Sequence, residues 1–340
     1  MTGDRSTASN MQPHAGMVRS ADQHGRGGRV VVTTVVEVYR VSRSFGAQSV
    51  LRELSFSIEQ GEIFCLLGPN GAGKTTTLEI LEGFLEPDSG SVRVLGCDPL
   101  ASGEALRRRV GVVLQESGFP KFFRVGEMIE TWRSYYDHPL AYDDILDLVG
   151  LRSDEAKLVR KLSGGQRRRL DFALAVAGDP EVIFLDEPTT GFDPEARARC
   201  WEAIVSLREL GKTILLTTHY LDEAERLGDR IAVLLDGAAG AIGSTQELAQ
   251  LANLRATVSF QAPSKDAEQL AREFPGLDAA SETVEGEVDE VRSLTRRLEL
   301  LDDHASQRAF ASLRVQPPSL EQAYLALVGR QSDPMDSTPQ

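Results

Sequence analysis

Residues 68–76 form a glycine-rich stretch, Gly68-Pro69-Asn70-Gly71-Ala72-Gly73-Lys74-Thr75-Thr76. The apolar run Ile63–Leu67 comes before it and predicts a buried strand, and residues 77–83 after it predict a helix. The pattern G-x-x-x-x-G-K-T between a strand and a helix is typical of a phosphate-binding loop. A glycine-rich turn that binds nothing is the alternative, but the lysine and both flanking elements favour the loop.

The residue types of this stretch suit a nucleotide phosphate chain. Glycines let backbone N–H groups turn inward without a side-chain clash, and the N-terminus of the following helix adds partial positive charge. Lys74 would place a point charge on the outer phosphates, and the Thr75 hydroxyl would ligate Mg²⁺. We therefore predict that residues 68–76 bind nucleotide.

Two carboxylates follow a second apolar run. Residues 182–185, Val-Ile-Phe-Leu, predict a buried strand that ends at Asp186 and Glu187. Asp186 would hold the Mg²⁺ shell, and Glu187 would orient and deprotonate the attacking water. Taken alone, a solvated acidic turn is the simpler interpretation; after a phosphate loop, catalytic carboxylates become the prediction.

A serine and two glycines open a predicted helix at residues 164–177, in the segment Leu162-Ser163-Gly164-Gly165-Gln166. Free N–H groups at such a helix start can receive an anion. An ordinary helix N-cap is the alternative for five residues in isolation. The position of the segment shortly before the acidic strand end makes the second anion site the stronger hypothesis.

These segments, in this order and followed by a histidine, resemble the ATPase domain of the ABC superfamily over about residues 35–245. The resemblance implies ATP and Mg²⁺ as cofactors. It also implies a homodimer that is obligate in the catalytic state, in which the Ser163 segment of one chain faces the phosphate loop of the other. ATP would lie between the two chains, in contact with Ser163, Gly164, Gly165 and Gln166.

The resemblance assigns four further positions. Phe45 matches the aromatic residue that stacks on adenine, and Gln115 matches the glutamine that contacts Mg²⁺ and water. Asp193 matches an aspartate of the dimer interface, although Phe192 replaces the usual leucine beside it. His219 matches the histidine that contacts the γ-phosphate. The implied catalytic residues are Glu187, His219 and Gln115, and the implied metal ligands are Thr75, Gln115 and Asp186.

The amino-acid composition limits the classes of partner and the compartment that can be expected for this chain. The 340 residues carry a net charge of −14, which disfavours binding to nucleic acid, and 41% of them are hydrophobic, enough for a core. Three cysteines without a CxxC pair predict a reducing compartment. No apolar run approaches the ~20 residues that cross a bilayer. The family resemblance implies a peripheral protein at the cytoplasmic face of the cell membrane, held there by a separate permease.

The chain divides by composition into four parts. We expect a disordered tail at 1–28, the ATPase domain at 29–245, a small C-terminal α+β accessory domain at 246–330 and a flexible tail at 331–340. Strands are predicted at 30–39, 54–58, 213–217 and 231–235, and helices at 125–136 and 142–149 within a helical subdomain at about 116–180. The resemblance implies an α/β P-loop NTPase fold with a mainly parallel core sheet and an antiparallel β subdomain.

The C-terminal segment bears on the kind of transport system. Residues 318–330 resemble the end of the ATPases that serve daunorubicin and other drug-resistance exporters of type two, and Ser319 with Gln322 predicts a capped helix ending before Gly329. The resemblance implies export of a drug-like or other small lipophilic molecule through separate permease chains. An importer ATPase and a soluble ABC ATPase remain alternatives. One phosphate loop without a coiled coil or cysteine cluster disfavours the soluble class.

Two basic runs lie on predicted helices, Arg107-Arg108-Arg109 and Arg167-Arg168-Arg169. Charge runs on a helix are usually solvated faces. We therefore predict that both runs are exposed to solvent and have no binding role.

Overall fold

The computed structural model describes residues 33–114, 118, 120, 122–280, 283–288, 291–300 and 312–332. The tail predicted at 1–28 lies outside these residues, as do Gln115 and the part of the second predicted tail from 333 to 340. The extent of the accessory domain and of the helical subdomain remains a prediction.

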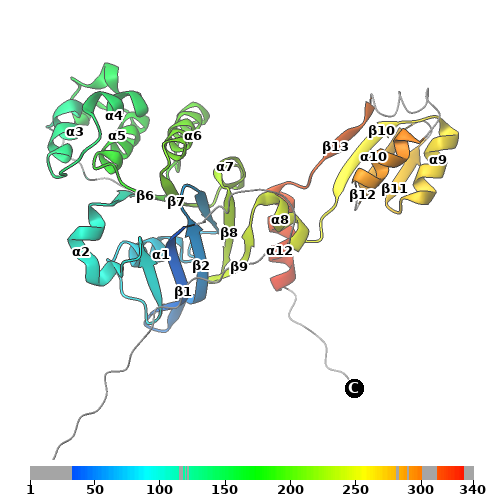
Figure 1. The fold of residues 1–340 in the computed structure, drawn as a ribbon, viewed down its shortest axis with the longest axis horizontal. Coiled ribbons are helices and arrows are strands. Elements are labelled where there is room, and N and C mark those ends of the chain that lie inside the picture. Colours follow the sequence, from blue (N-terminus) through cyan, green and yellow to red (C-terminus); the bar gives the residue numbers. More distant parts are fainter. Residues whose placement is uncertain are drawn as a thin grey trace, which may run out of the picture. The chain divides into compact units, whose positions relative to one another are not determined.

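A six-stranded sheet forms the centre of the predicted ATPase domain (Figure 1). Its order is β5-β6-β7-β3-β8-β9, with only β9 antiparallel to its neighbour. The strands are β3 (Ile63–Leu67), β5 (Val110–Val113), β6 (Val182–Asp186), β7 (Thr213–Thr218), β8 (Arg230–Leu235) and β9 (Ala238–Gly243). Because β3, β6 and β7 are parallel, their carboxyl ends meet at one edge of the sheet, where the predicted motifs begin.

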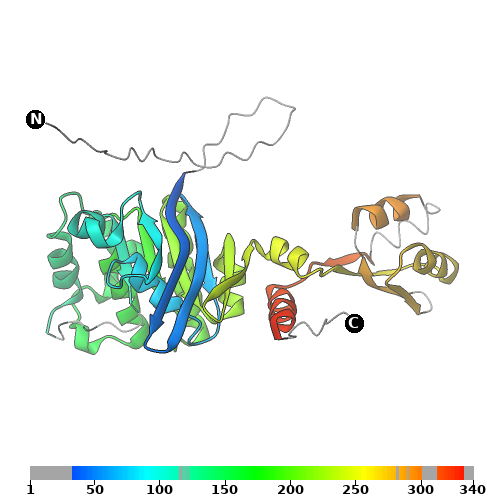
Figure 2. The ribbon, with the colours of Figure 1, turned by 90° about the horizontal axis from the view of Figure 1, so that it is seen from below.

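A second, antiparallel sheet packs beside the first. It consists of β1 (Thr34–Phe45), β2 (Gln48–Glu59) and β4 (Ser89–Val94) in the order β2-β1-β4. Figure 2 shows β1 and β2 as two long neighbouring strands, in blue. The strand predicted at 30–39 is thus β1 from Thr34 onward, and it continues to Phe45 because the hairpin with β2 pairs its second half. The predicted strand 54–58 forms part of β2.

Alternate side chains of β3 point into two hydrophobic cores. Phe64 and Leu66 pack with helix α1 (Lys74–Leu81) and the antiparallel sheet, whereas Cys65 packs on the opposite face. Helices α6 (Pro194–Glu209), α7 (Leu221–Leu227) and α8 (Thr245–Leu251) contribute to that opposite core, and α2 (Pro99–Arg107) follows β4. Helix α1 begins at Lys74, three residues earlier than predicted, because the loop ends at Gly73.

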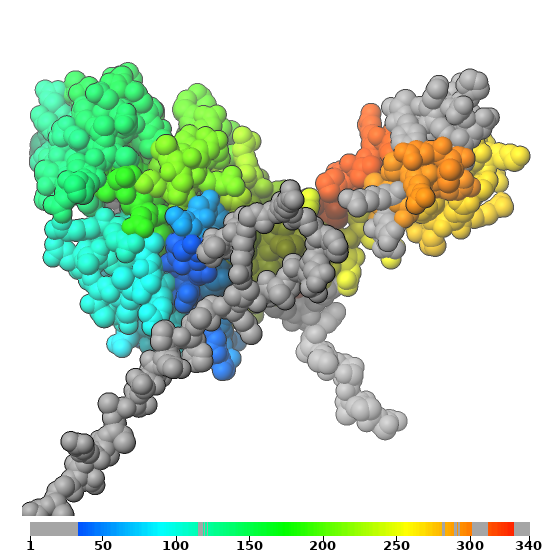
Figure 3. Space-filling model, viewed as in Figure 1, coloured from blue at the N-terminus to red at the C-terminus, as the bar shows by residue number. Residues whose placement is uncertain are grey.

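Among the described residues between β5 and β6, three helices and two short 3₁₀ turns form an insertion. They are α3 (Val125–Arg133), α4 (Tyr142–Leu148), the turns Arg152–Asp154 and Val159–Lys161, and α5 (Gly164–Val176). Met128, Ile145 and Leu170 are fully buried where the three helices meet. In the space-filling view the helices of the insertion form one continuous green mass (Figure 3). The predicted helices are present, but α3 ends at Arg133 rather than near residue 136.

The C-terminal part contains a βαββαβ unit. It runs β10 (Ala256–Gln261), α9 (Ser264–Glu273), β11 (Leu277–Ala280), β12 (Thr283–Val288), α10 (Val291–Glu299) and β13 (Arg314–Gln316). The sheet order β11-β12-β10-β13 with antiparallel neighbours is that of a ferredoxin-like split β-α-β fold. Val258, Phe260 and Leu270 belong to its separate small core.

Helix α12 (Leu320–Ser332) packs against the predicted ATPase domain. Leu320 and Ala323 are buried in the same core as α7 and α8, and the Leu320 N–H donates to Glu225 Oε1 at 3.0 Å. Ser319 and Gln322 exchange the two hydrogen bonds of the predicted capping box. The helix extends to Ser332, beyond the predicted end.

Candidate active site

The phosphate loop joins the buried strand β3 to helix α1. Gly71 (φ 82°) and Gly73 (φ 98°) adopt left-handed backbone conformations that a side chain disfavours. A Cβ on Gly73 would lie 2.5 Å from the Leu51 side chain, so only glycine closes the loop here. The exposed tip consists of Pro69, Asn70 and Gly71, while Gly68, Ala72 and Gly73 are buried, Thr75 is exposed and Thr76 is half-buried.

Lys74 is buried within the loop. Its Nζ donates to the carbonyl oxygens of Gly68 at 2.8 Å and Pro69 at 3.1 Å, and it lies 3.2 Å from Glu187 Oε1. The ammonium group is therefore held at the centre of the loop, where the resemblance predicts phosphate. The structure brings Lys74 and Glu187 together although more than a hundred residues separate them in the sequence.

Hard oxygen ligands for a cation lie beside the lysine. Thr75 Oγ1 donates to Asp186 Oδ2 at 3.1 Å, and Thr217 Oγ1 donates to Asp186 Oδ1 at 2.6 Å. Among the described residues, no group of three or more His, Cys, Asp or Glu side chains is arranged to hold a metal ion by itself. Such a partial set fits Mg²⁺, which takes one or two carboxylate ligands and completes its shell with water and phosphate oxygens.

Glu187 stands at the end of β6 in an unusual backbone conformation. Its φ of 44° is left-handed, and its N–H donates to Thr217 Oγ1 at 3.0 Å. Thr190 Oγ1 donates to Glu187 Oε2 at 3.1 Å. Burial raises the pKa of this carboxyl, but the neighbouring Lys74 and His219 outweigh burial and hold the pKa below its usual value. The side chain is therefore in the carboxylate form that a general base requires.

His219 follows β7 and reaches the same carboxylate. Its Nδ1 lies 3.3 Å from Glu187 Oε1, but without the geometry of a hydrogen bond, and the ring packs against Tyr220 with centroids 4.1 Å apart. The structure thus gathers Lys74, Thr75, Asp186, Glu187 and His219 at one edge of the sheet.

The Ser163 segment lines a different cleft of about 450 Å³. Ser163 is the N-cap of α5: its Oγ accepts from the Gln166 N–H at 3.2 Å, and its N–H donates to Gln166 Oε1 at 2.9 Å. Gln166 Nε2 also donates to Asp154 Oδ2 at 3.0 Å. Gly164, Gly165 and Asp193 line the same cleft, so the structure brings these predicted residues together, apart from the phosphate loop.

The other predicted positions are more scattered. Phe45 ends β1 with 48% of its surface exposed, and the Arg43 guanidinium lies 5.0 Å from its ring centroid. Asp193 caps α6 by accepting from the Ala196 N–H at 2.8 Å. Gln115 lies outside the described residues, so its predicted contact with the cation remains a prediction.

Sequence reasoning missed Thr217 and misjudged Arg168. Thr217 contacts both Asp186 and Glu187, and the only signal was a hydroxyl residue in the apolar strand before His219. The prediction of a solvated face is confirmed for Arg107 and Arg108, which are exposed. It is wrong for Arg168, which is buried because its guanidinium binds backbone carbonyl groups.

A strand, a glycine-rich loop around a lysine, and acidic residues at the end of a neighbouring strand define a P-loop nucleotide hydrolase. A family model described as "ABC transporter" matches residues 51–190. The Nod factor export ATP-binding protein I of Rhizobium etli is 35% identical over 307 residues, which cover 88% of this chain and 95% of that protein. The protein of the same name from Paraburkholderia xenovorans is 37% identical over 303 residues, covering 87% and 97%.

Solved structures agree with this class. An ATP-binding subunit of an ABC transporter is 27% identical, with a TM-score of 0.59, and covers 65% of this chain and 94% of that one. The chain belongs to the family of ABC transporter ATP-binding proteins, and it is an ATP-hydrolysing transporter subunit. No helix in the described ranges has the length and apolar character needed to span a membrane.

Proposed function

We propose that this chain is the ATP-binding subunit of an ABC exporter and that it works as a homodimer on the cytoplasmic face of a separate permease. One observation carries the proposal: Glu187 Oε1 lies 3.2 Å from Lys74 Nζ, next to the Thr75–Asp186 pair. This arrangement combines a phosphate-binding cation, oxygen ligands for a metal and a carboxylate base.

The proposed reaction assigns one role to each side chain. Lys74 binds the outer phosphates, and Thr75 with Asp186 would hold Mg²⁺, which neutralises charge on the phosphates. Glu187 accepts a proton from the attacking water. His219, beside Glu187, would contact the γ-phosphate, and Phe45 would stack on adenine.

The separation of the Ser163 cleft from the phosphate loop within one chain supports a dimer. Within one chain, Ser163 and Asp193 line one cleft, and Lys74 lies in the phosphate loop at another edge. A second copy would bring its Ser163 cleft onto the first copy's phosphate loop. Two equivalent sites then form in a symmetric, self-complementary interface.

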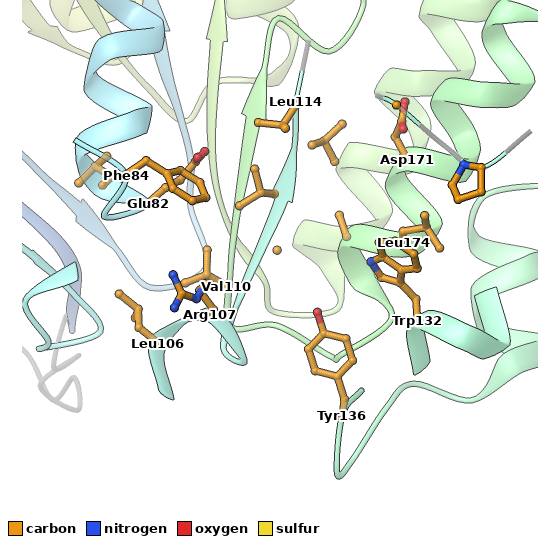
Figure 4. Close-up of a pocket in the computed structure, with 17 residues that line it drawn as sticks. Glu82, Phe84, Leu106, Arg107, Val110, Leu114, Trp132, Tyr136, Asp171 and Leu174 are labelled. Atoms are coloured by element: carbon orange, nitrogen blue, oxygen red, sulfur yellow. The ribbon is translucent and has the colours of Figure 1, made fainter. Parts of the chain in front are cut away.

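An apolar groove supports a permease partner. The groove measures about 480 Å³ and opens between β5 and α3 (Figure 4). Its lining comes from both the core and the helical insertion: Phe84, Leu106, Leu114, Trp132, Tyr136 and Leu174. We assign this groove to a short helix of the permease, because apolar walls with a few polar groups suit an amphipathic helix.

The direction and cargo rest on resemblance. Relatives that match along almost their whole length are named Nod factor export proteins, and residues 318–330 resemble the drug-resistance exporters of type two. We therefore propose a small lipophilic or drug-like cargo. An importer subunit and a soluble ABC ATPase remain the alternatives.

Nucleotide-driven pairing tests the composite site. Purified Glu187→Gln protein with Mg²⁺ and ATP should double in mass by size-exclusion chromatography with light scattering, and EDTA or ADP should return it to the monomer. A protein that stays monomeric under these conditions, even with its permease supplied, would overturn the proposed dimer.

Fractionation and transport assays distinguish an exporter subunit from an importer subunit and from a soluble ABC ATPase. The tagged chain should sediment with membranes and with a polytopic membrane protein; sedimentation with ribosomes would instead favour the soluble alternative. In inside-out vesicles, ATP should drive accumulation of a fluorescent drug such as daunorubicin. Accumulation that occurs only in right-side-out vesicles would indicate an importer.

A further inference from the structure

Arg168 is a buried arginine in helix α5, five residues after the cap Ser163. Its side chain is 8% exposed. Nε donates to the Pro188 carbonyl at 3.0 Å and Nη2 donates to the Asp186 carbonyl at 3.0 Å. Nη1 donates to the Leu114 carbonyl and lies 3.7 Å from Asp171 Oδ2. One guanidinium group therefore binds three backbone carbonyls from two segments outside its own helix.

Two of these carbonyls flank Glu187. The residue between them has a φ of 44°, a left-handed conformation that is strained for a residue with a Cβ. Such conformations persist where surrounding contacts determine them, and they concentrate at functional sites. The Glu187 N–H bond to Thr217 fixes the same peptide from its other side.

We propose that Arg168 is a positioning residue for ATP hydrolysis: it holds the carbonyls of Asp186 and Pro188 and so fixes the backbone that carries the Glu187 carboxylate. This inference rests on the general-base role proposed above for Glu187. Arg168 acts indirectly, through these backbone carbonyls. It acts by keeping the carboxylate beside Lys74, and a displacement of about 1 Å at a reacting group can cost roughly 10²-fold in rate.

Arginine suits this task better than lysine. Its planar group presents five N–H donors in a fixed fork, whereas lysine offers one ammonium point. Burial lowers the pKa of Arg168, but an arginine remains protonated at neutral pH. The third bond, to Leu114, also fixes the chain at the end of β5, immediately before Gln115.

Three variants test the role: Arg168→Gln, Arg168→Lys and, as a matched control, Arg167→Gln, which changes the exposed neighbour on the same helix. Arg168→Gln should lower kcat by roughly 10- to 100-fold while KM for ATP stays within about threefold, because binding residues are untouched. Arg168→Lys should be intermediate, and the control should stay within about twofold of the wild type. An unchanged kcat in folded Arg168→Gln protein overturns the proposal.

A double-mutant cycle separates positioning from general structural damage. In a Glu187→Gln background, Arg168→Gln should change the single-turnover rate by less than about twofold. An equal loss in both backgrounds would mean that Arg168 does not act through Glu187. If Arg168→Gln does not fold, Arg168→Lys replaces it in the cycle. If Glu187→Gln alone retains full activity, the general-base role itself fails, whatever Arg168 does.

Discussion

Among single residues, Lys74 and Glu187 form a largely buried ion pair. In the proposed reaction Lys74 binds the phosphates, whereas Glu187 accepts a proton from water. Their side chains are only 5% and 11% exposed, and Lys74 contributes to the low pKa of Glu187. A phosphate bound to Lys74 would offset the positive charge that the ammonium group exerts on the Glu187 carboxylate. The pKa of Glu187 should then rise toward the operating pH, where a general base is most effective.

Glu187→Gln should separate hydrolysis from binding. We expect the hydrolysis rate to fall about 10²-fold or more, because the amide cannot accept the proton. ATP affinity should stay equal or increase, because a negative charge near the phosphates is removed. Steady-state hydrolysis and titration with a fluorescent ATP analogue measure the two effects. Glu202→Gln, at an exposed position of α6, is the control; wild-type turnover in Glu187→Gln would contradict the assignment.

The candidate site was predictable where it is local in the sequence. Lys74 and Thr75 lie in one loop, and Asp186 and Glu187 are adjacent at one strand end, so each motif specifies its own geometry. Arg168 could not be identified in the same way. Its partners lie 54, 18 and 20 residues away, and a basic run gives no sign of which arginine turns inward.

At the scale of elements, the end of α1 and strand β5 form a groove with one unusual carboxyl group. Burial, with the charges of Asp186 and Glu79, raises the pKa of Glu82 to about 8. The folded protein therefore binds this proton more tightly than the unfolded chain does. The contribution of Glu82 to the free energy of unfolding should therefore fall as pH rises from about 4.5 to about 8, because in that window its carboxyl holds more protons in the folded state.

Glu82→Gln should remove this pH dependence. The amide does not titrate, so the variant should be more stable than the wild type at pH 8 by about 1–2 kcal/mol, a figure reduced because the groove is open to solvent. Below pH 4.5 the two proteins should be equally stable. Chemical denaturation across this range checks the result, with the exposed Glu86→Gln as control. A destabilised variant at pH 8 would refute the argument.

Elements differed in how well the sequence predicted them. Strands β3, β6, β7 and β8 were predicted because their buried faces require almost continuous apolar residues. Strand β9, with the sequence Ala-Ala-Gly-Ala-Ile-Gly, has few residues with strand propensity. It forms because β8 offers it an edge to pair with, and that is tertiary information.

At the scale of the whole molecule, α12 joins the C-terminal part of the chain to the ATPase core. The capping box identified the helix from sequence, but its packing partners α7 and α8 lie about 70 to 100 residues earlier. Its contact through Leu320, which is fully buried, makes the core of the ATPase domain depend on residues far outside the nucleotide motifs.

Leu320→Ala should destabilise the ATPase domain itself. Loss of a fully buried leucine costs about 2–5 kcal/mol, so the free energy of unfolding measured from the ATPase domain should fall by that order. Leu325→Ala, on the same helix but 61% exposed, should be nearly neutral. Equal effects of the two substitutions would mean that α12 does not stabilise the core.

Complementation between two inactive chains tests the proposed assembly. Lys74→Ala removes the phosphate cation. Ser163→Asp keeps a good N-cap for α5 but places a negative charge where the partner's phosphate would lie. Each variant alone should form two defective composite sites. In a mixed dimer, one site receives both changes and the other receives neither.

An equal mixture should therefore recover about a quarter of wild-type activity, since about half of the dimers are mixed and each has one intact site of two. Recovery must increase with protein concentration, because it depends on association between chains. If Lys74 and Ser163 served the same nucleotide within one chain, no mixture would recover activity. Suppose that hydrolysis stays at the level of the separate variants although two different affinity tags, purified in sequence, recover mixed dimers. Lys74 and Ser163 would then have to act on the same nucleotide within a single chain.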